Sequence, residues 1–152
     1  MKTTDLKWQQ RFLDVATEVA QWSKDPSTKV GCVMVSEDGV IVATGYNGLP
    51  RGVQDHPERM ERPTKYLWTV HAEAAAVANA ARSGARLNGA TAFVTHMSCA
   101  GCARLMLNAG IACVVVGPGK TSMPADEFEA AATMFEEAGV QTWLLDEGGI
   151  DT

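Results

Sequence analysis

The spacing of apolar and polar positions predicts a helix near the start of the chain. Between residues 5 and 24, apolar side chains recur every three or four positions, as in a helix that buries one face. Asp25 and Pro26 end this pattern, because proline cannot continue a helix. The apolar positions are Trp8, Phe12, Val15, Ala16, Val19 and Trp22.

Two apolar runs that follow predict a pair of strands. They span 30–35 and 40–46, and the intervening 37–39 (Glu-Asp-Gly) has the chemistry of a hairpin turn. Residues 47–69 then show no periodicity and carry several glycines and prolines. A loop of this length inside a compact domain is usually functional.

The second half of the chain alternates helices with strands. Each predicted helix is followed within two residues by a glycine, which is a typical C-terminal signal. The resulting order of elements favours an α/β fold in a single domain, 1–152, with one mixed sheet covered by helices on both faces. Helices are predicted at 72–83, 100–108 and 124–138, and strands at 91–95, 112–116 and 140–145.

Composition narrows the classes of partner. The 152 residues are 46% hydrophobic and 20% charged, with a net charge of −5, so we expect no affinity for nucleic acid or for anionic membranes. No apolar stretch approaches the ~20 residues of a membrane span. The N-terminus lacks an apolar signal core, so we expect a cytoplasmic protein whose four cysteines are free or bound to metal.

Two short segments carry the candidate chemistry. His71 and Glu73 lie where the long loop passes into a helix, and Cys99 and Cys102 lie where a strand passes into the next helix. Cysteines three apart in the first turn of a helix point toward one ion, and the helix N-terminus favours the thiolate that binds metal. Three nitrogen and sulfur ligands with an open fourth position are typical of catalytic zinc. The pattern therefore predicts Zn²⁺ held by His71, Cys99 and Cys102, with Glu73 as the catalytic proton carrier.

These residue types also occur in other kinds of site. A single Cys-x-x-Cys is also found in redox pairs and in halves of structural zinc sites, but no second pair exists, and Cys32 and Cys113 fall within predicted strands. His96 competes with His71 as a ligand, although its place at a strand end without a nearby carboxylate favours a pocket or packing role. His56 is interpreted as an ordinary loop histidine.

The order of the motifs resembles the deoxycytidylate (dCMP) deaminase family. His-x-Glu followed by Cys-x-x-Cys is a signature of zinc nucleobase deaminases. The segments 23–31 (Ser-Lys-Asp-Pro-Ser-Thr-Lys-Val-Gly) and 45–52 (Gly-Tyr-Asn-Gly-Leu-Pro-Arg-Gly) precede it, and the likeness runs from about residue 6 to 145.

The resemblance implies a three-layer α/β/α cytidine deaminase-like fold with a mixed five-stranded sheet. It implies that Asn47 bonds the sugar hydroxyl of a nucleotide. It also implies a homo-oligomer and, in some members, regulation by dCTP and dTTP as effectors.

The chain departs from the family pattern at three places. Ala75 stands where an asparagine is usual, and Ser98 stands where proline usually precedes the first cysteine. Residues 117–122 (Gly-Pro-Gly-Lys-Thr-Ser) replace a segment that encloses the nucleotide in many relatives. This stretch is interpreted either as a loop whose backbone N–H groups hold a phosphate or as a flexible connection.

The remaining candidates concern substrate binding. Besides Asn47, we expect Lys29, Ala72, Ser98, Arg51 and Lys120 to contact the substrate, with the cations serving a phosphate. Other cations near the loop, and Tyr46, Tyr66 and Trp68 as stacking aromatics, have ordinary surface or packing roles as alternatives. The full set of phosphate candidates is Lys29, Arg51, Arg59, Arg62, Lys65 and Lys120.

The sequence as a whole predicts a zinc-dependent hydrolase that deaminates a cytosine-type nucleotide, dCMP to dUMP, in pyrimidine salvage. One alternative keeps the chemistry on another substrate: a modified pyrimidine, free cytosine or an aminopurine. The other is a non-catalytic, zinc-stabilised nucleotide-binding module, for which Glu73 would serve no purpose.

Overall fold

A mixed sheet of six strands forms the centre of the computed structural model, which describes residues 2–146 and 149–151. The strand order is β2-β1-β3-β4-β5-β6. β1 pairs antiparallel with β2 and with β3, whereas β3, β4 and β5 run parallel, and β6 is antiparallel to β5. The strands are β1 (Gly31–Val35), β2 (Ile41–Tyr46), β3 (Thr91–His96), β4 (Cys113–Gly119), β5 (Gln141–Asp146) and β6 (Gly149–Asp151).

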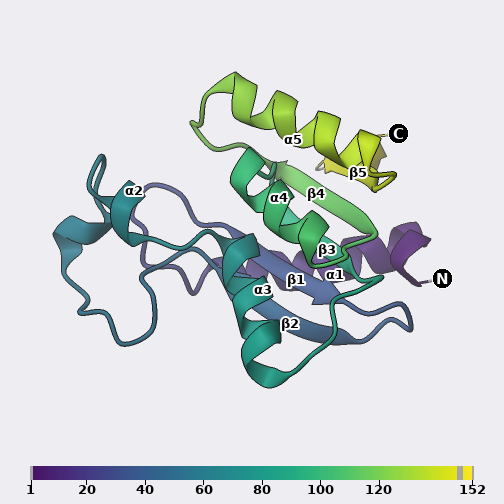
Figure 1. The fold of residues 1–152 in the computed structure, drawn as a ribbon, viewed down its shortest axis with the longest axis horizontal. Coiled ribbons are helices and arrows are strands. Elements are labelled where there is room, and N and C mark those ends of the chain that lie inside the picture. Colours follow the sequence, from purple (N-terminus) through teal and green to yellow (C-terminus); the bar gives the residue numbers. More distant parts are fainter. Residues whose placement is uncertain (1, 147–148, 152) are drawn as a thin grey trace.

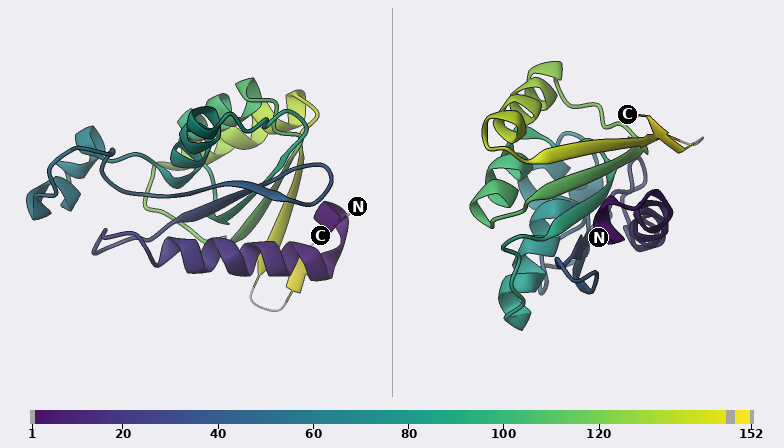
Figure 2. Two further views of the ribbon diagram at one scale, coloured as in Figure 1. Left: turned by 90° about the horizontal axis from the view of Figure 1, so that it is seen from below. Right: turned by 90° about the vertical axis from the view of Figure 1, so that its right-hand side faces the viewer.

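Helices cover both faces of the sheet (Figures 1 and 2). α1 lies on one face, and α3, α4 and α5 lie on the other, which gives the expected three layers. The helices are η1 (Lys2–Thr4), α1 (Leu6–Ala20), η2 (Pro57–Met60), α2 (Lys65–Trp68), α3 (Ala72–Ser83), α4 (Ala100–Asn108) and α5 (Ala125–Glu137), of which η1 and η2 are 3₁₀ turns.

Residues of the inner strands contribute alternately to two hydrophobic layers, because successive side chains of a strand point to opposite faces of the sheet. Val33, Phe93 and Val115 are fully buried against α1, beside Phe12 and Ala16. On the other face, the buried strand residues pack against the helix residues of α3, α4 and α5. These residues include Cys32, Met34, Ala92, Val94, Val114, Ala76, Ala103, Met106, Ala131 and Phe135.

Close packing of α3 on β2 places the start of α3 at the edge of the sheet. Gly45 of β2 lies under this helix, where a Cβ atom would fall 2.3 Å from the Ala72 carbonyl oxygen and 2.4 Å from the Ala76 nitrogen. Glycine at this position and alanines along α3 therefore let the helix backbone touch the strand.

The predicted bounds of the two helices that carry the site residues, α3 and α4, are confirmed. α1 is shorter than its pattern predicts, ending at Ala20 instead of residue 24. The chain leaves the helix there through a tight turn, and the Ser23 hydroxyl bonds the Asn47 carbonyl oxygen at 2.7 Å.

The long segment between β2 and α3 protrudes from one end of the molecule (Figures 1 and 2). Residues 47–69 contain η2 and α2 in place of the unstructured loop that their composition indicates. The base of the segment is closed by a pair of backbone hydrogen bonds between Gly48 and Val70.

Two strand predictions are corrected. β4 continues to Gly119, so Gly117–Gly119 belong to the sheet and are neither a phosphate loop nor a flexible connection. The glycines are required because a Cβ at Gly117 would lie 2.8 Å from the Thr95 carbonyl oxygen, and one at Gly119 would lie 2.6 Å from the His96 ring. β6 adds a sixth strand at the edge of the five that were predicted.

Across the described residues, none of the helices combines the length and apolar character that crossing a bilayer requires.

Candidate active site

The candidate chemistry gathers where two helices begin. His71 precedes the first residue of α3, and Cys99 precedes the first residue of α4, with Cys102 in the first turn of that helix. β3 ends at His96, just before these cysteines. The site therefore lies at the carboxyl ends of the parallel strands, which is the usual position of ligand sites in α/β sheets.

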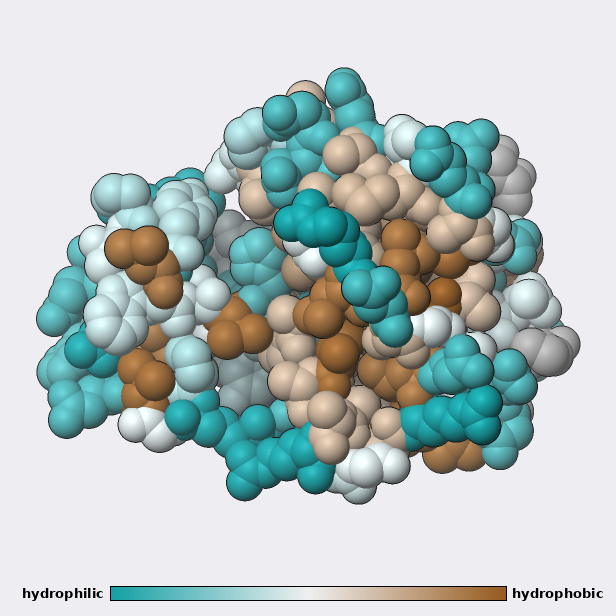
Figure 3. All heavy atoms as spheres, viewed as in Figure 1, coloured by the Kyte–Doolittle hydropathy of each residue, from teal (hydrophilic) through white to brown (hydrophobic). Residues whose placement is uncertain are grey.

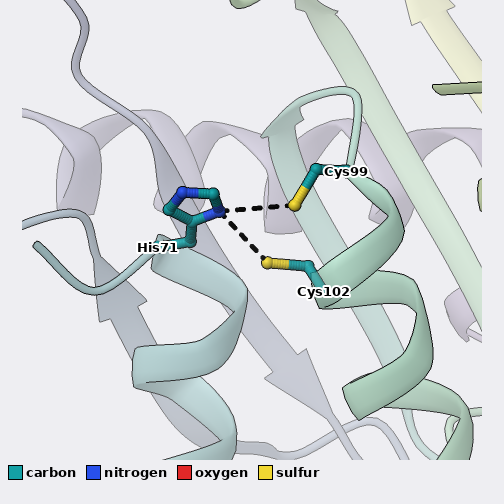
Figure 4. A group of neighbouring side chains, drawn as sticks. All are labelled: His71, Cys99 and Cys102. Carbon is teal, nitrogen blue, oxygen red and sulfur yellow. Dashed lines mark hydrogen bonds between the residues drawn. The ribbon is translucent and has the colours of Figure 1, made fainter. Parts of the chain in front are cut away.

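The three predicted ligands point toward one another (Figure 4). The Nδ1 atom of His71 lies 3.4 Å from the sulfur of Cys99 and 3.4 Å from that of Cys102. A tetrahedral zinc ion with its usual bond lengths separates nitrogen from sulfur by ~3.6 Å. The ligand atoms all lie within 4.8 Å of one another, with both cysteines buried and His71 exposed, so the three residues fit a zinc ion that is open to a pocket.

The hydrogen bond between the two thiols shifts their pKa values in opposite directions. A hydrogen bond with the Cys102 thiol lowers the pKa of Cys99 to about 4, against the effect of burial and with help from His71. The same hydrogen bond, together with burial, raises the pKa of Cys102. The lowered pKa of Cys99 favours its thiolate, which is the form that binds metal.

Glu73 lies in the first turn of α3 with 4% of its surface exposed. Burial raises the pKa of its carboxyl, and the negative charge of Cys99 adds to the rise. The nearby Ser98 hydroxyl acts in the other direction, although it makes no hydrogen bond of good geometry. A carboxyl whose pKa moves toward neutrality is suited to accept and release a proton.

A pocket opens beside these residues, between the protruding segment and the body of the molecule, where the surface in Figure 3 is hollowed. Its walls come from the 25–30 turn, the protruding segment, the start of α3 and the chain beyond β3 and β4. The lining residues are Asp25, Thr28, Val30, Asn47, Lys65, Tyr66, Thr69, His71, Ala72, Glu73, His96, Met97, Cys99, Thr121 and Met123.

Two of the predicted substrate contacts, Asn47 and Ala72, are among these lining residues. Ser98 is buried beside Glu73 and stands outside the lining. Lys29, Arg51 and Lys120 are exposed and do not line the pocket.

The other histidines occupy the places that the sequence favours. His96 lines the pocket, its Nδ1 lies 2.7 Å from the Thr95 hydroxyl oxygen, and burial lowers its pKa. It is not part of the cluster of metal-ligating atoms among the described residues. His56 is a loop residue whose Nε2 lies 2.9 Å from the Gln54 side-chain oxygen.

Sequence reasoning missed several residues of the site. The sequence indicates Lys65 only as a phosphate candidate. Asp25, and the ion pair of 2.9 Å that joins it to Lys65 in the pocket wall, were missed because the two residues stand 40 positions apart in the chain. Glu127 of α5 accepts a hydrogen bond of 3.3 Å from the first backbone N–H of α4, beside Cys99. Its place in the first turn of α5 gave no sign of this contact. Thr121 also lines the pocket, and its position within 117–122 was the one available signal.

Comparison with known proteins agrees with this geometry. The family described as "Cytidine and deoxycytidylate deaminase zinc-binding region" matches residues 6–118, which include the three candidate ligands and Glu73. The chain is 41% identical over 143 residues to the "Uncharacterized deaminase in luxG 3'region" of Aliivibrio fischeri, covering 91% of this chain and 94% of that protein. It is 36% identical over 141 residues to the deoxycytidylate deaminase of Homo sapiens, covering 89% and 78% respectively.

A solved structure also has the same fold. The dCMP deaminase of the cyanophage S-TIM5, in complex with dCMP and dUMP, superposes with a TM-score of 0.77 at 22% identity, over 93% of this chain and 99% of that one. The predicted three-layer fold is thereby confirmed.

Proposed function

The chain belongs to the zinc-dependent cytidine and deoxycytidylate deaminase family, and on this premise we propose that it hydrolyses dCMP to dUMP and ammonia. One observation carries the proposal. The buried carboxyl of Glu73 lies in the same pocket as a histidine nitrogen and two cysteine sulfurs whose spacing fits a zinc ion. A structural zinc site needs no such carboxyl and leaves no ligand position open to a pocket.

His71, Cys99 and Cys102 hold the zinc in this proposal. When bound, the zinc lowers the pKa of a water molecule at its open position to ~7. The negative charge of the two cysteines would balance the ion, and His71 is exposed and lines the pocket.

Glu73 moves the protons. Its carboxylate takes a proton from the attacking water and delivers it to ring nitrogen N3 of cytosine, while the water oxygen bonds to C4. A second transfer moves the proton of this new hydroxyl to the 4-amino group, so that the C4–N bond breaks and ammonia leaves. Proton transfer of this kind contributes about 10²–10⁴ in rate. The raised pKa of Glu73 supports this role, because one group must both accept and release protons near neutral pH.

Asn47 and Ala72 are proposed to contact the nucleoside, with Asn47 bonding the sugar hydroxyl. The Asn47 amide is held in place, because its oxygen accepts from the Val30 N–H at 2.8 Å and its nitrogen donates to the Thr28 carbonyl at 2.9 Å. Ser98, which is buried beside Glu73, is also proposed to contact the substrate.

Lys29, Arg51 and Lys120 are proposed to serve the phosphate. All three are exposed, so their side chains need to reach toward the pocket mouth when the nucleotide binds. Removal of Lys29 or Lys120 should then raise KM for dCMP much more than KM for deoxycytidine. Equal effects on both substrates would assign the lysine another role.

A substrate panel tests the proposal. Zinc-loaded protein is incubated with dCMP, dCTP, deoxycytidine, cytosine and guanine, and ammonia release is measured. We expect the highest kcat/KM on dCMP. Preference for an unphosphorylated pyrimidine or for a purine would assign that compound as the substrate in place of dCMP. Bound zinc without ammonia release from any of the five compounds would support a non-catalytic binding module.

The second candidate substrate is the unphosphorylated nucleoside. It is favoured by one observation: the lining cation Lys65 is already paired with Asp25, and the other phosphate candidates stand outside the lining. The panel separates the two directly.

The setting of the reaction completes the proposal. We place the enzyme in the cytoplasm, in pyrimidine salvage, as a homo-oligomer, with dCTP and dTTP as candidate effectors. Light scattering tests the oligomer, and initial rates with and without each triphosphate test the regulation.

A further inference from the structure

A buried ion pair in the pocket wall takes no part in the proton transfers described above. The Lys65 ammonium lies 2.9 Å from the Asp25 carboxylate, and their side chains are 7% and 3% exposed. Removing two charges from water is costly, so such a pair needs good geometry and additional hydrogen bonds to persist. Both residues line the pocket.

Asp25 organises the turn that forms one side of this wall. One carboxylate oxygen accepts from the backbone N–H of Ser27 at 2.8 Å, the Ser27 hydroxyl at 2.9 Å and the backbone N–H of Thr28 at 3.1 Å. Lys65 donates a second hydrogen bond, to the Ser27 hydroxyl at 3.1 Å. The two charges therefore hold the same turn from two directions.

The 25–28 turn also holds the side chain of Asn47. The Asn47 side-chain nitrogen donates to the Thr28 carbonyl at 2.9 Å. It also lies 3.5 Å from the second carboxylate oxygen of Asp25, which is the oxygen that binds Lys65. A change in the charge or position of Asp25 would therefore alter the positions of Thr28 and Asn47 through these contacts.

Lys65 also links the wall to the protruding segment, because it is the first residue of α2. A second lysine–aspartate pair, Lys24 with Asp55, joins the same segment to the body, but its side chains are 76% and 50% exposed. Exposed pairs contribute little, whereas a buried pair fixes the groups that it joins.

We propose that Asp25 and Lys65 are a positioning pair, which anchors the protruding segment to the pocket wall and holds Asn47 in the orientation that binds the sugar hydroxyl of the substrate. The inference rests on the proposed deamination of a cytosine nucleotide. It assigns the pair to substrate affinity and leaves zinc binding and proton transfer to other residues.

The test separates affinity from turnover in Lys65→Met and Asp25→Asn. In each variant we expect wild-type zinc content, kcat within about threefold of wild type and KM for dCMP raised at least about tenfold. The double variant Asp25→Asn/Lys65→Met removes both charges, so it should regain thermal stability while its KM stays high. Lys65→Arg, which keeps the charge, should recover most of the affinity.

A substrate without the 3′-hydroxyl distinguishes positioning of Asn47 from a purely structural role, which would leave the KM difference between the two substrates unchanged. In the wild type, 2′,3′-dideoxycytidine 5′-monophosphate should show a higher KM than dCMP. In Lys65→Met this difference should shrink, because Asn47 no longer meets the hydroxyl in its proper orientation.

The matched control is Lys24→Met, which removes the exposed lysine–aspartate pair of the same segment and should keep wild-type KM. A folded, zinc-loaded Lys65→Met or double variant with wild-type KM for dCMP overturns the inference, and so does an undiminished penalty for the dideoxy substrate. Absence of ammonia release from wild-type protein on every substrate is a different result, because it overturns the proposed function itself.

Discussion

Glu73 and the two cysteines divide the work of the site between them. The cysteines are buried at a helix start, and the lowered pKa of Cys99 favours the thiolate that a metal requires. Glu73 is buried beside them without joining the ligand cluster. Metal binding and proton transfer are therefore separable by single substitutions.

Glu73→Gln tests the proton carrier. The amide has nearly the same shape but cannot carry the proton, so zinc content should be unchanged while kcat on dCMP falls by about 10²–10⁴ or more. Metal analysis and an ammonia assay on the same sample measure both. A zinc-replete Glu73→Gln protein with full activity contradicts the assignment.

Cys99→Ala and Cys102→Ala test the metal ligands. Either change leaves two of three ligand atoms, so the purified variants should lose most of their zinc, as measured by elemental analysis. Cys113→Ala is the matched control, since this cysteine lies on β4 outside the cluster and its removal should leave the zinc in place. Retention of full zinc in Cys99→Ala would point to a different ligand set.

The reacting residues were predictable from local sequence, and their supporting contacts were not. His71, Glu73, Cys99 and Cys102 stand at short fixed spacings in two helix starts, so the pattern alone indicates a shared ion. Asp25 and Lys65 meet only through the fold, and each in isolation has the appearance of a solvated surface charge. Sequence spacing carries no information about a pair of this kind.

At the scale of elements, the packing of α3 on β2 decides where His71 and Glu73 stand. The helix rests on Gly45 with no room for a side chain between them. Any atom added there pushes away the helix that carries half of the site.

Gly45→Ala tests this contact. We expect a loss of about 1–3 kcal/mol in the free energy of unfolding, from overpacking, together with reduced kcat/KM as α3 shifts. Gly101→Ala is the matched control in α4, because its Cβ would meet the nearest atoms at 3.8 and 3.9 Å, which is ordinary contact. It should keep or raise stability, since alanine favours a helix over glycine. Chemical denaturation measures both, and equal stability of the two variants contradicts the packing argument.

The ends of helices and strands were predictable where a nearby residue in the sequence caps them. The predictions failed where contacts with distant parts of the chain determine the end. α3 and α4 match their predicted ranges because glycines stand close behind them in sequence. The Gly-Pro-Gly run of 117–119 has the composition of a loop, yet it continues β4, where Gly119 pairs with His96 of β3. Glycine suits positions 117 and 119 because Thr95 and His96 leave little room for side chains. The composition of a segment does not show whether a neighbouring strand pairs with it.

For the whole molecule, the buried ion pair predicts a dependence of stability on pH. Burial by itself raises the pKa of Asp25, but the Lys65 ammonium and the donors of Ser27 and Thr28 outweigh it, so the pKa lies below its ordinary value. The stabilisation is fully present above the unfolded pKa of about 3.9 and is lost as pH falls through the lower folded pKa.

Thermal unfolding at a series of pH values measures this effect. Wild-type Tm should fall steeply below about pH 4, whereas Asp25→Asn, already less stable at pH 7, should lose less over the same interval. Asp55→Asn, which alters only the exposed pair, should follow the wild type. Parallel curves for wild type and Asp25→Asn contradict the prediction. A single transition in these scans would also support the proposal of one domain over 1–152.

The three ligand atoms and the proton carrier all come from one continuous helix–strand–helix stretch, 71–102, whereas most of the pocket wall around them comes from other parts of the chain. The reaction centre and most of the wall that surrounds the substrate are therefore encoded in different segments of the chain. We therefore expect exchanges within 25–30, 47–69 or 120–123 to change which substrates the pocket admits more than they change the arrangement of the three metal ligands. Substrate preference can therefore change in such an architecture while the deamination chemistry is kept. A library of variants confined to those three segments is the natural starting point for changing the substrate.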